Sequence, residues 1–258
     1  MIFTQAIVRL PGASYTQGLT TSSALGAPVL SNALAQHRSY MEALQSCGLK
    51  VKVLEPDEAH PDSTFVEDTA VIAERVAVAT RPGAPSRAGE VSSIVAALRS
   101  LGRATVAIEA PGTVDGGDVC QADEHFLIGV SERTNESGAR QLADILQTHG
   151  YRASLIDVRS VPGLLHLKSG LTYLGDGRFI VAPGMPADEA LSGYQQIAVE
   201  GDEIYAANAV RVNDRVFIAA GFPGIAEKLA ALHVSVVSLD VSEFRKMDGG
   251  LSCLSLRF

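Results

Sequence analysis

Hydrophobic and polar positions alternate along the chain in patterns that predict helices followed by strands. The segment SNALAQHRSYMEALQSCG spaces Leu34, Met41 and Leu44 at helical intervals, which predicts a helix that begins at Ser31 and ends at Gly48. The next segment, LKVKVLE, alternates apolar and polar residues as a strand does. Two apolar runs separated by two charged residues in TAVIAERVAVATR then predict a hairpin.

The same order of helix, strand, loop and hairpin returns along the chain. The second unit contains GEVSSIVAALRSLG, RATVAIEA, PGTVDGGD and VCQADEHFLIGV, and the third contains NESGARQLADILQTHG, YRASLIDV, SVPGLLHLKSG and a hairpin that turns at GDG. A weaker fourth unit has a short helix near PADEALSGY, the strand QIAVE, the loop GDEIYAAN and the hairpin AVRVNDRVFIAA. The fifth has the helix GIAEKLAALHV, the strand SVVSLD and the loop VSEFRKMDGG, but only one hairpin strand, LSCLSLRF.

The first strand of the chain can complete the fifth unit. IFTQAIVRL precedes the first helix and has no strand partner within its own unit. Five similar units with complementary end strands predict a closed, propeller-like α/β ring, formed by residues 1–258 as a single domain. A mixed α/β sheet without symmetry is the alternative. In a ring, the loops that precede the hairpins would converge near the axis.

Composition narrows the classes of function. The chain has 21 basic and 29 acidic residues, a net charge of −8, and no basic cluster interleaved with aromatic residues, which disfavours a nucleic-acid partner. No apolar stretch is long enough to span a membrane, and MIFTQAIVRLPG lacks the features of a signal peptide. The three cysteines without CxxC spacing predict neither a disulfide framework nor a zinc site, and they fit the cytoplasm.

The predicted loops contain the residues with catalytic potential. In chain order these are Glu67 and Asp68, Asp115 and Asp118, His166, Asn208, and Cys253. A thiol, an imidazole and several carboxylates suit nucleophilic catalysis on a cationic carbon, and buried carboxylates would need such a cation nearby. The sequence leaves alternatives open, because His166 between leucines suits a protein core and Cys253 suits a terminal apolar strand. No histidine pair has metal-ligand spacing, so no metal is expected.

Six motifs together carry a resemblance to a known family. They are HPDSTFVED, TRPGAPSRAGE, EAPGTVDGGDV, SERTNESGARQL, LLHLKSG and KMDGGLSCLSLRF. In this order they resemble the bacterial dimethylarginine dimethylaminohydrolases of the guanidine-modifying superfamily, and the resemblance extends from GLTTSS to the last residue. It implies a five-bladed α/β propeller of ββαβ-type repeats, with the site on the axis and no cofactor.

The resemblance also implies a reaction, in which methylated arginine is converted to citrulline through a covalent thiouronium intermediate. Cys253 would be the nucleophile, and His166 would protonate the departing amine and later activate water. Asp68 and Asp115 would hold the guanidinium nitrogens, with Glu67 supporting them from the rim of the site.

The amino-acid end of the substrate requires groups of opposite charge. By the same resemblance, Arg87 and Arg133 would bind the α-carboxylate. Asp62, together with the backbone carbonyls of Leu19 and Met247, would receive the α-ammonium group.

Further positions follow from the same resemblance. Phe65 would line the substrate channel, and GLTTSS lies where a mobile lid would be. Some members of the family have Glu where this chain has Asp115, and the difference of one methylene leaves the alkyl-group preference open.

Three competing functions remain open from the sequence. One is another activity of the superfamily, namely arginine deiminase, agmatine deiminase or amidinotransferase. The second is a non-catalytic guanidine-binding protein, which would need the carboxylates but neither Cys253 nor His166. The third is an unrelated thiol amidase, which would need N–H donors for an oxyanion where this chain has carboxylates. The sequence allows a homodimer without requiring one.

Overall fold

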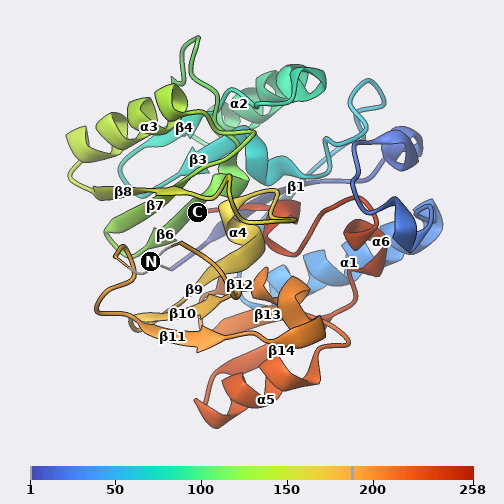
Figure 1. Ribbon diagram of the computed structural model, residues 1–258. Helices are drawn as coiled ribbons and strands as arrows, with labels where there is room; N and C mark the ends of the chain where they lie inside the picture. Colours follow the sequence, from blue (N-terminus) through green and yellow to red (C-terminus); the bar gives the residue numbers. More distant parts are fainter. Residues whose placement is uncertain (1, 187–188) are drawn as a thin grey trace.

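The computed structural model describes residues 2–186 and 189–258, which form five three-stranded sheets with the longer helices on their outer sides and one short helix near the centre (Figure 1). The helices are α1 (Leu30–Ser46), α2 (Val91–Ser100), α3 (Glu136–Thr148), α4 (Leu167–Gly170), α5 (Pro223–Ala231) and α6 (Ser242–Arg245). The arrangement is the α/β propeller that the repeated pattern predicts.

Each sheet combines an antiparallel pair of strands, a hairpin in four of the five sheets, with a third strand that runs parallel to the central strand. Four sheets follow one another along the chain. The first consists of β3 (Ala70–Ile72), β4 (Ala77–Ala79) and β5 (Val106–Ala107), and the second of β6 (Val119–Ala122), β7 (His125–Val130) and β8 (Arg152–Asp157). The third consists of β9 (Leu171–Gly175), β10 (Arg178–Val181) and β11 (Gln195–Ala198), and the fourth of β12 (Val210–Val212), β13 (Arg215–Ala219) and β14 (Ser235–Leu239). In the first, second and fourth of these sheets, α2, α3 and α5 connect the hairpin to the parallel strand, as the expected repeat requires.

The fifth sheet joins the two ends of the chain. It consists of β15 (Leu256–Arg257), β1 (Gln5–Arg9) and β2 (Lys50–Leu54), with β1 in the centre. The backbone N–H groups of Thr4 and Gln5 both donate to the carbonyl of Phe258, at 2.9 and 2.8 Å. The prediction that the first strand completes the last unit is therefore confirmed.

Several local predictions are wrong, each because a distant contact decides the outcome. Helix α1 begins at Leu30 rather than Ser31, because Glu243 from another blade accepts the N–H of Val29 and caps the helix from outside. Its buried face contains Tyr40 and Leu44, whereas the side chain of Leu34 is exposed.

The predicted strand around Cys253 and the predicted fourth helix also differ from the structure. Cys253 lies in a 3-10 helix (Ser252–Leu254), and the strand begins only at Leu256. The helix expected near PADEALSGY includes Ala187 and Asp188, which lie outside the described residues, and residues 189–194 form turns. No helix in the described ranges is long and apolar enough to cross a lipid bilayer.

The hydrophobic contacts explain why the closing strand matters for stability. Ile7 of β1, Leu256 of β15 and Phe258 belong to one buried cluster with Ile94 and Leu98 of α2. The helix of the neighbouring blade therefore packs on the junction of the two chain ends, and the ring closes through side chains as well as through backbone hydrogen bonds.

We expect Phe258→Ala to lower the free energy of unfolding by about 3 kcal/mol or more, because the Phe258 ring is 5% exposed and its loss leaves a cavity at the ring closure. Urea unfolding followed by circular dichroism measures this change. Ile2→Ala is the matched control near the other chain end, since Ile2 is 79% exposed and the substitution should change stability by less than about 0.5 kcal/mol. Similar losses for the two variants would contradict closure by packing.

Candidate active site

Loops from four of the five blades, together with residues 19–21, meet at the axis and enclose a cavity of about 190 Å³. The residues of the predicted site that line it are Leu19, Asp62, Phe65, Asp68, Arg87, Asp115, Arg133, His166, Met247 and Cys253. They come from positions spread over more than 200 residues, so the ring is what brings them together.

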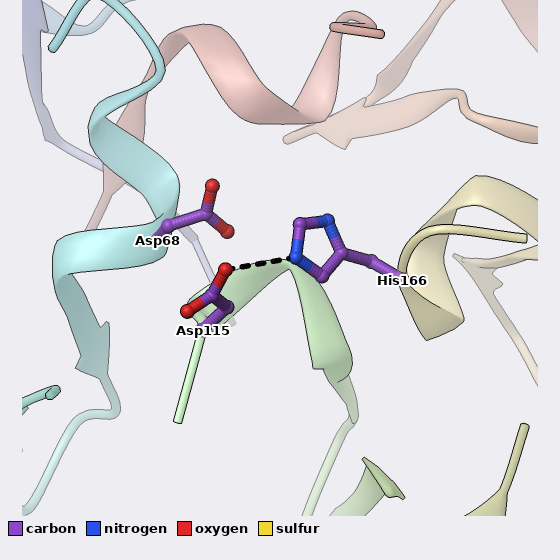
Figure 2. A group of neighbouring side chains, drawn as sticks. All are labelled: Asp68, Asp115 and His166. Carbon is purple, nitrogen blue, oxygen red and sulfur yellow. Dashed lines mark hydrogen bonds and ion pairs between the residues drawn. The ribbon is translucent and has the colours of Figure 1, made fainter. Parts of the chain in front are cut away.

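Asp68, Asp115 and His166 form the acidic side of the cavity (Figure 2). His166 Nε2 lies 3.0 Å from Asp115 Oδ2, and the backbone N–H of Gly83 donates to Asp115 Oδ1 at 2.8 Å. The N–H of Gly117 donates to Asp68 Oδ1, also at 2.8 Å. A side chain at position 117 would place its Cβ within 3 Å of both Asp68 and His166, so the turn requires glycine.

This concentration of carboxylates changes the protonation of His166. Burial lowers the pKa of the imidazole, but the negative charges of Asp68 and Asp118 and the hydrogen bond to Asp115 outweigh burial and raise the pKa to about 9. The pKa of Asp68 falls to about 2, because His166 and the guanidinium of Arg87 outweigh the effect of its own burial. At neutral pH the site therefore contains an imidazolium beside the ionised carboxylate of Asp68.

The carboxylates around the cavity also raise the pKa of Cys253. Burial, followed by the negative charges of Glu67 and Asp68, raises the pKa of the thiol to about 12. One backbone N–H group, that of Gly250, approaches Sγ at 3.4 Å and favours the thiolate only weakly. The thiol of Cys253 is thus neutral at neutral pH. This argues against a permanent thiolate–imidazolium pair and favours formation of the thiolate when a cation binds beside the sulfur.

One oxygen or nitrogen atom from each of Asp68, Asp115 and His166 lies within 4.8 Å of the others, a spacing that a metal ion could bridge. A metal requires the neutral imidazole, whereas the pKa of about 9 keeps His166 protonated at neutral pH. Asp68 also already pairs with Arg87 Nη1 at 2.5 Å. The arrangement is better suited to an organic cation that donates hydrogen bonds.

Glu67 does not lie at the rim, and this expectation is wrong. Glu67 and Asp68 lie in the 3-10 helix Val66–Thr69, where successive side chains point about 120° apart. Asp68 faces the cavity, whereas Glu67 turns away, pairs with Lys168 Nζ at 2.6 Å and accepts a hydrogen bond from Ser252 Oγ at 2.8 Å. Glu67 therefore supports the segment that carries Cys253 from behind.

The two arginines differ in the contacts they already make. Arg87 is buried and donates to Asp68, to Glu90 at 2.8 Å and to the carbonyl of Phe65 at 2.9 Å. Arg133 is partly buried, and no carboxylate of residues 2–186 or 189–258 lies within 4.0 Å of its guanidinium. Arg133 is therefore the more available of the two for an incoming carboxylate.

The segment GLTTSS (residues 18–23), which is expected to be a lid, covers the cavity and is held there by polar contacts. The N–H of Leu19 donates to Asp62 Oδ1 at 3.0 Å, and burial raises the pKa of Asp62. Thr21 and Ser22 donate to the carboxylate of Asp248, at 2.5 Å from both the backbone nitrogen of Thr21 and the hydroxyl of Ser22. Asp248 was not expected from the sequence, because only the folded loop brings it opposite residues 20–22.

Asn208 joins three blades behind the catalytic loops. Its amide nitrogen donates to the carbonyl of Lys168 at 3.1 Å and to Ser252 Oγ at 3.0 Å, and its amide oxygen accepts the N–H of Ser252 at 3.1 Å. An amide is required because the side chain both donates and accepts. Asn208 thus fixes the Cys253 segment relative to the segment that follows His166, although it does not line the cavity.

Comparisons with known proteins give a consistent result. The arginine deiminase family profile matches residues 100–219. The N(G),N(G)-dimethylarginine dimethylaminohydrolase of Pseudomonas aeruginosa is 44% identical over 258 residues and covers 100% of both chains. The structure of a cysteine-to-serine variant of the Pseudomonas aeruginosa enzyme, complexed with citrulline, superposes with a TM-score of 0.95 at 43% identity over 100% of both chains. A dimethylarginine dimethylaminohydrolase adduct with S-methyl-L-thiocitrulline has a TM-score of 0.94 at 43% identity, also over 100% of both chains.

The raised pKa of His166 predicts a specific dependence of stability on pH. A folded pKa of about 9, compared with 6.5 when exposed, means that the imidazolium stabilises the fold fully below pH 6.5 and loses this effect as the pH rises to about 9. The free energy of unfolding should fall by roughly 3 kcal/mol over this range of pH. Urea unfolding at pH values from 6.5 to 9 measures it.

His166→Asn should remove most of this slope, although it lowers stability at every pH by leaving carboxylates without a counter-charge. The control is His233→Asn, because His233 lies in a turn with φ of +57°, a conformation that asparagine tolerates. The control should keep the slope of the wild-type protein. An equal slope in the His166 variant would show that the carboxylates do not hold a proton on His166.

Proposed function

The chain belongs to the dimethylarginine dimethylaminohydrolase family, and we infer from this premise that it hydrolyses Nω,Nω-dimethyl-L-arginine to L-citrulline and dimethylamine. Nω-monomethyl-L-arginine gives methylamine by the same route. The observation that carries the assignment is a neutral, partly buried thiol that shares one cavity with an imidazolium and two carboxylates. This combination needs a cationic substrate to become reactive.

The first half of the reaction forms a bond between sulfur and carbon. The guanidinium would donate hydrogen bonds to Asp68 and Asp115, which place its central carbon before Cys253 Sγ. Its positive charge beside the sulfur lowers the pKa of the thiol and favours the thiolate, and the thiol proton passes to solvent. Attack gives a tetrahedral carbon, and His166 donates its proton to the dimethylamine nitrogen as the carbon–nitrogen bond breaks.

The second half releases citrulline from the thiouronium. The neutral imidazole of His166 accepts a proton from water, and the resulting hydroxide attacks the carbon. The carbon–sulfur bond breaks, the oxygen becomes the carbonyl of citrulline, and the sulfur takes back a proton. His166 and Cys253 thus return to their starting protonation states, and no cofactor is consumed.

The other end of the cavity would hold the amino-acid part of the substrate. Arg133 supplies the accessible guanidinium for the α-carboxylate, and Arg87 adds positive charge while it orients Asp68. Asp62 and the carbonyls of Leu19 and Met247 would bind the α-ammonium group, and Phe65 covers the alkyl chain. The Leu19 segment would open to admit the substrate, because polar contacts to Asp248 hold it closed.

Residues 1–258 are proposed to act as a single domain, since the first and last strands share one sheet. Every residue with an assigned role belongs to one chain, so the chemistry does not require the homodimer that the sequence allows. The three free thiols suit the reducing cytoplasm, which we propose as the location.

Cys253→Ser should reduce citrulline production by on the order of a thousandfold or more, because a hydroxyl is far less nucleophilic than a thiolate. Citrulline production is measured with dimethylarginine, monomethylarginine and arginine in parallel, which also separates this activity from that of an arginine deiminase. Intact mass spectrometry of the wild-type protein during turnover should detect the covalent adduct, which the variant should lack.

Cys47→Ser is the matched control. Cys47 caps the end of α1 away from the cavity, so the substitution should cost stability of about 1 kcal/mol and leave the specific activity unchanged. Appreciable citrulline from the Cys253 variant would reject Cys253 as the nucleophile.

Arg133→Ala should raise KM for dimethylarginine by roughly 10-fold to 100-fold, because a charged hydrogen bond to a carboxylate contributes about 1.5–3 kcal/mol. The same variant should change KM little for Nω,Nω-dimethylagmatine, which lacks the carboxylate. Arg133 is chosen over Arg87 because loss of Arg87 would also leave Asp68 and Glu90 buried without a partner. Equal losses for the two substrates would show that Arg133 does not bind the carboxylate.

A further inference from the structure

A second cavity, of about 170 Å³, lies on the other side of the segments that carry the catalytic residues. Glu67 and Ser252 line the second cavity, whereas their chain neighbours Asp68 and Cys253 line the active site. We call the two segments Glu67–Asp68 and Ser252–Cys253 the partition. The two cavities thus share a wall only one residue thick.

An ion pair crosses the face of the partition that lines the second cavity. Lys168 Nζ lies 2.6 Å from Glu67 Oε1, and Arg257 Nη2 lies 3.5 Å from the same oxygen. Glu67 Oε2 accepts from Ser252 Oγ at 2.8 Å. Any change in the partners of Glu67 therefore reaches Ser252 and its neighbour Cys253 directly.

The charges around the second cavity favour an anion. Lys168, Arg211 and Arg257 are opposed by two carboxylates, Glu67 and Asp123, which leaves one net positive charge on the wall. Asp123 already accepts the hydroxyl of Tyr173, and Glu67 is satisfied by the ion pair. The groups of the second cavity that can still form hydrogen bonds with a ligand are therefore among its cationic side chains.

Arg211 has guanidinium donors left for a ligand, whereas Nη1 of Arg257 already donates to the carbonyl and the hydroxyl of Ser255, at 2.9 and 2.6 Å. Arg257 Nε is buried and has no hydrogen-bond partner in the described part of the chain. Arg211 donates through Nε to the carbonyl of Asn213 at 3.0 Å, and within the described ranges no carboxylate lies within 4.0 Å of its guanidinium. A buried donor without an acceptor costs free energy, which an acceptor-only ligand would recover.

The remaining wall gives the size and polarity of the ligand. Phe3, Val71, Ile72, Phe126 and Leu256 supply apolar surface opposite the cationic groups. Half-buried Phe3 and exposed Asp123 mark the end of the cavity that faces the solvent. An anionic head with a short apolar body matches both parts of this lining.

We propose that the second cavity binds a small organic monocarboxylate through Arg211 and Arg257, and that its occupancy slows the reaction through the partition. A carboxylate near Arg257 and Lys168 competes with Glu67 for these cations. Glu67 then presents more uncompensated negative charge to Cys253 and disfavours the thiolate. The ligand does not occupy the substrate cavity, so kcat falls while KM stays nearly constant. The slowing, but not the binding, rests on the proposed role of Cys253.

The test uses 3-bromobenzoate as the probe and 3-bromobenzyl alcohol as its neutral analogue. Calorimetry measures the affinity of the wild-type protein, of Arg211→Met and of the control Arg215→Met, whose guanidinium contacts Ser46 at the exposed side of the same hairpin. Anomalous scattering of bromine in a crystal locates the probe. Citrulline production with and without the probe gives kcat and KM.

We expect bromine in the second cavity, affinity for the carboxylate only, and a loss of affinity of at least about tenfold in Arg211→Met alone. Arg211→Met without probe should keep the wild-type kcat, and it should also lose the inhibition of kcat by the probe. Bromine only in the active-site cavity, equal binding of the alcohol, or unchanged affinity of Arg211→Met would overturn the site.

Binding in the second cavity without a change in kcat would overturn the coupling. An absence of citrulline production in the wild-type protein without probe would instead reject the proposed function, while calorimetry and the bromine position would still decide whether the second cavity binds the carboxylate.

Discussion

Compensation of buried negative charge at the axis is the constraint on which this structure depends. Glu67, Asp68, Asp115 and Asp118 are each at most 3% exposed. A buried carboxylate without a partner would cost several kcal/mol, so each has a dedicated one: Lys168 for Glu67, Arg87 for Asp68 and His166 for Asp115. Asp118 accepts the hydroxyl of Ser131 and the N–H of Leu167. Lys168 and His166 belong to a different blade from the carboxylates they pair with, so these two contacts also hold neighbouring blades together, whereas Arg87 and Asp68 belong to the same blade.

The arrangement of the partners separates two roles of acidic residues. Asp68 and Asp115 face the cavity and can exchange part of their hydrogen bonding for a substrate. Glu67 and Asp118 face away and fix the segments of Cys253 and His166. Short loops at the axis can supply both kinds of acidic residue, because nearby residues of one loop point to opposite sides of that loop.

The sequence predicted the four hairpins, the parallel partner strands and the closure between β1 and β15, because these depend on local periodicity and on counting unpaired strands. From the residues alone it pointed to Asp68, Asp115, His166 and Cys253, whereas the other residues that line the cavity, and all of the roles, came from the resemblance. It failed where a distant residue decides, as at Val29, which Glu243 caps. Glu67 was misplaced because a 3-10 turn rather than an extended segment sets its direction, and Asp248 was missed because its contacts form only in the folded loop.

The protonation of Cys253 also has a consequence for the chemical lifetime of the protein. Oxidants attack the thiolate rather than the thiol, and a pKa of about 12 leaves almost none of this residue ionised at neutral pH. In the unfolded chain the same thiol would return toward its ordinary value of about 8.5 and would be more easily oxidised. Burial and the carboxylates that raise the pKa of the Cys253 thiol therefore also protect this residue from oxidation by peroxide.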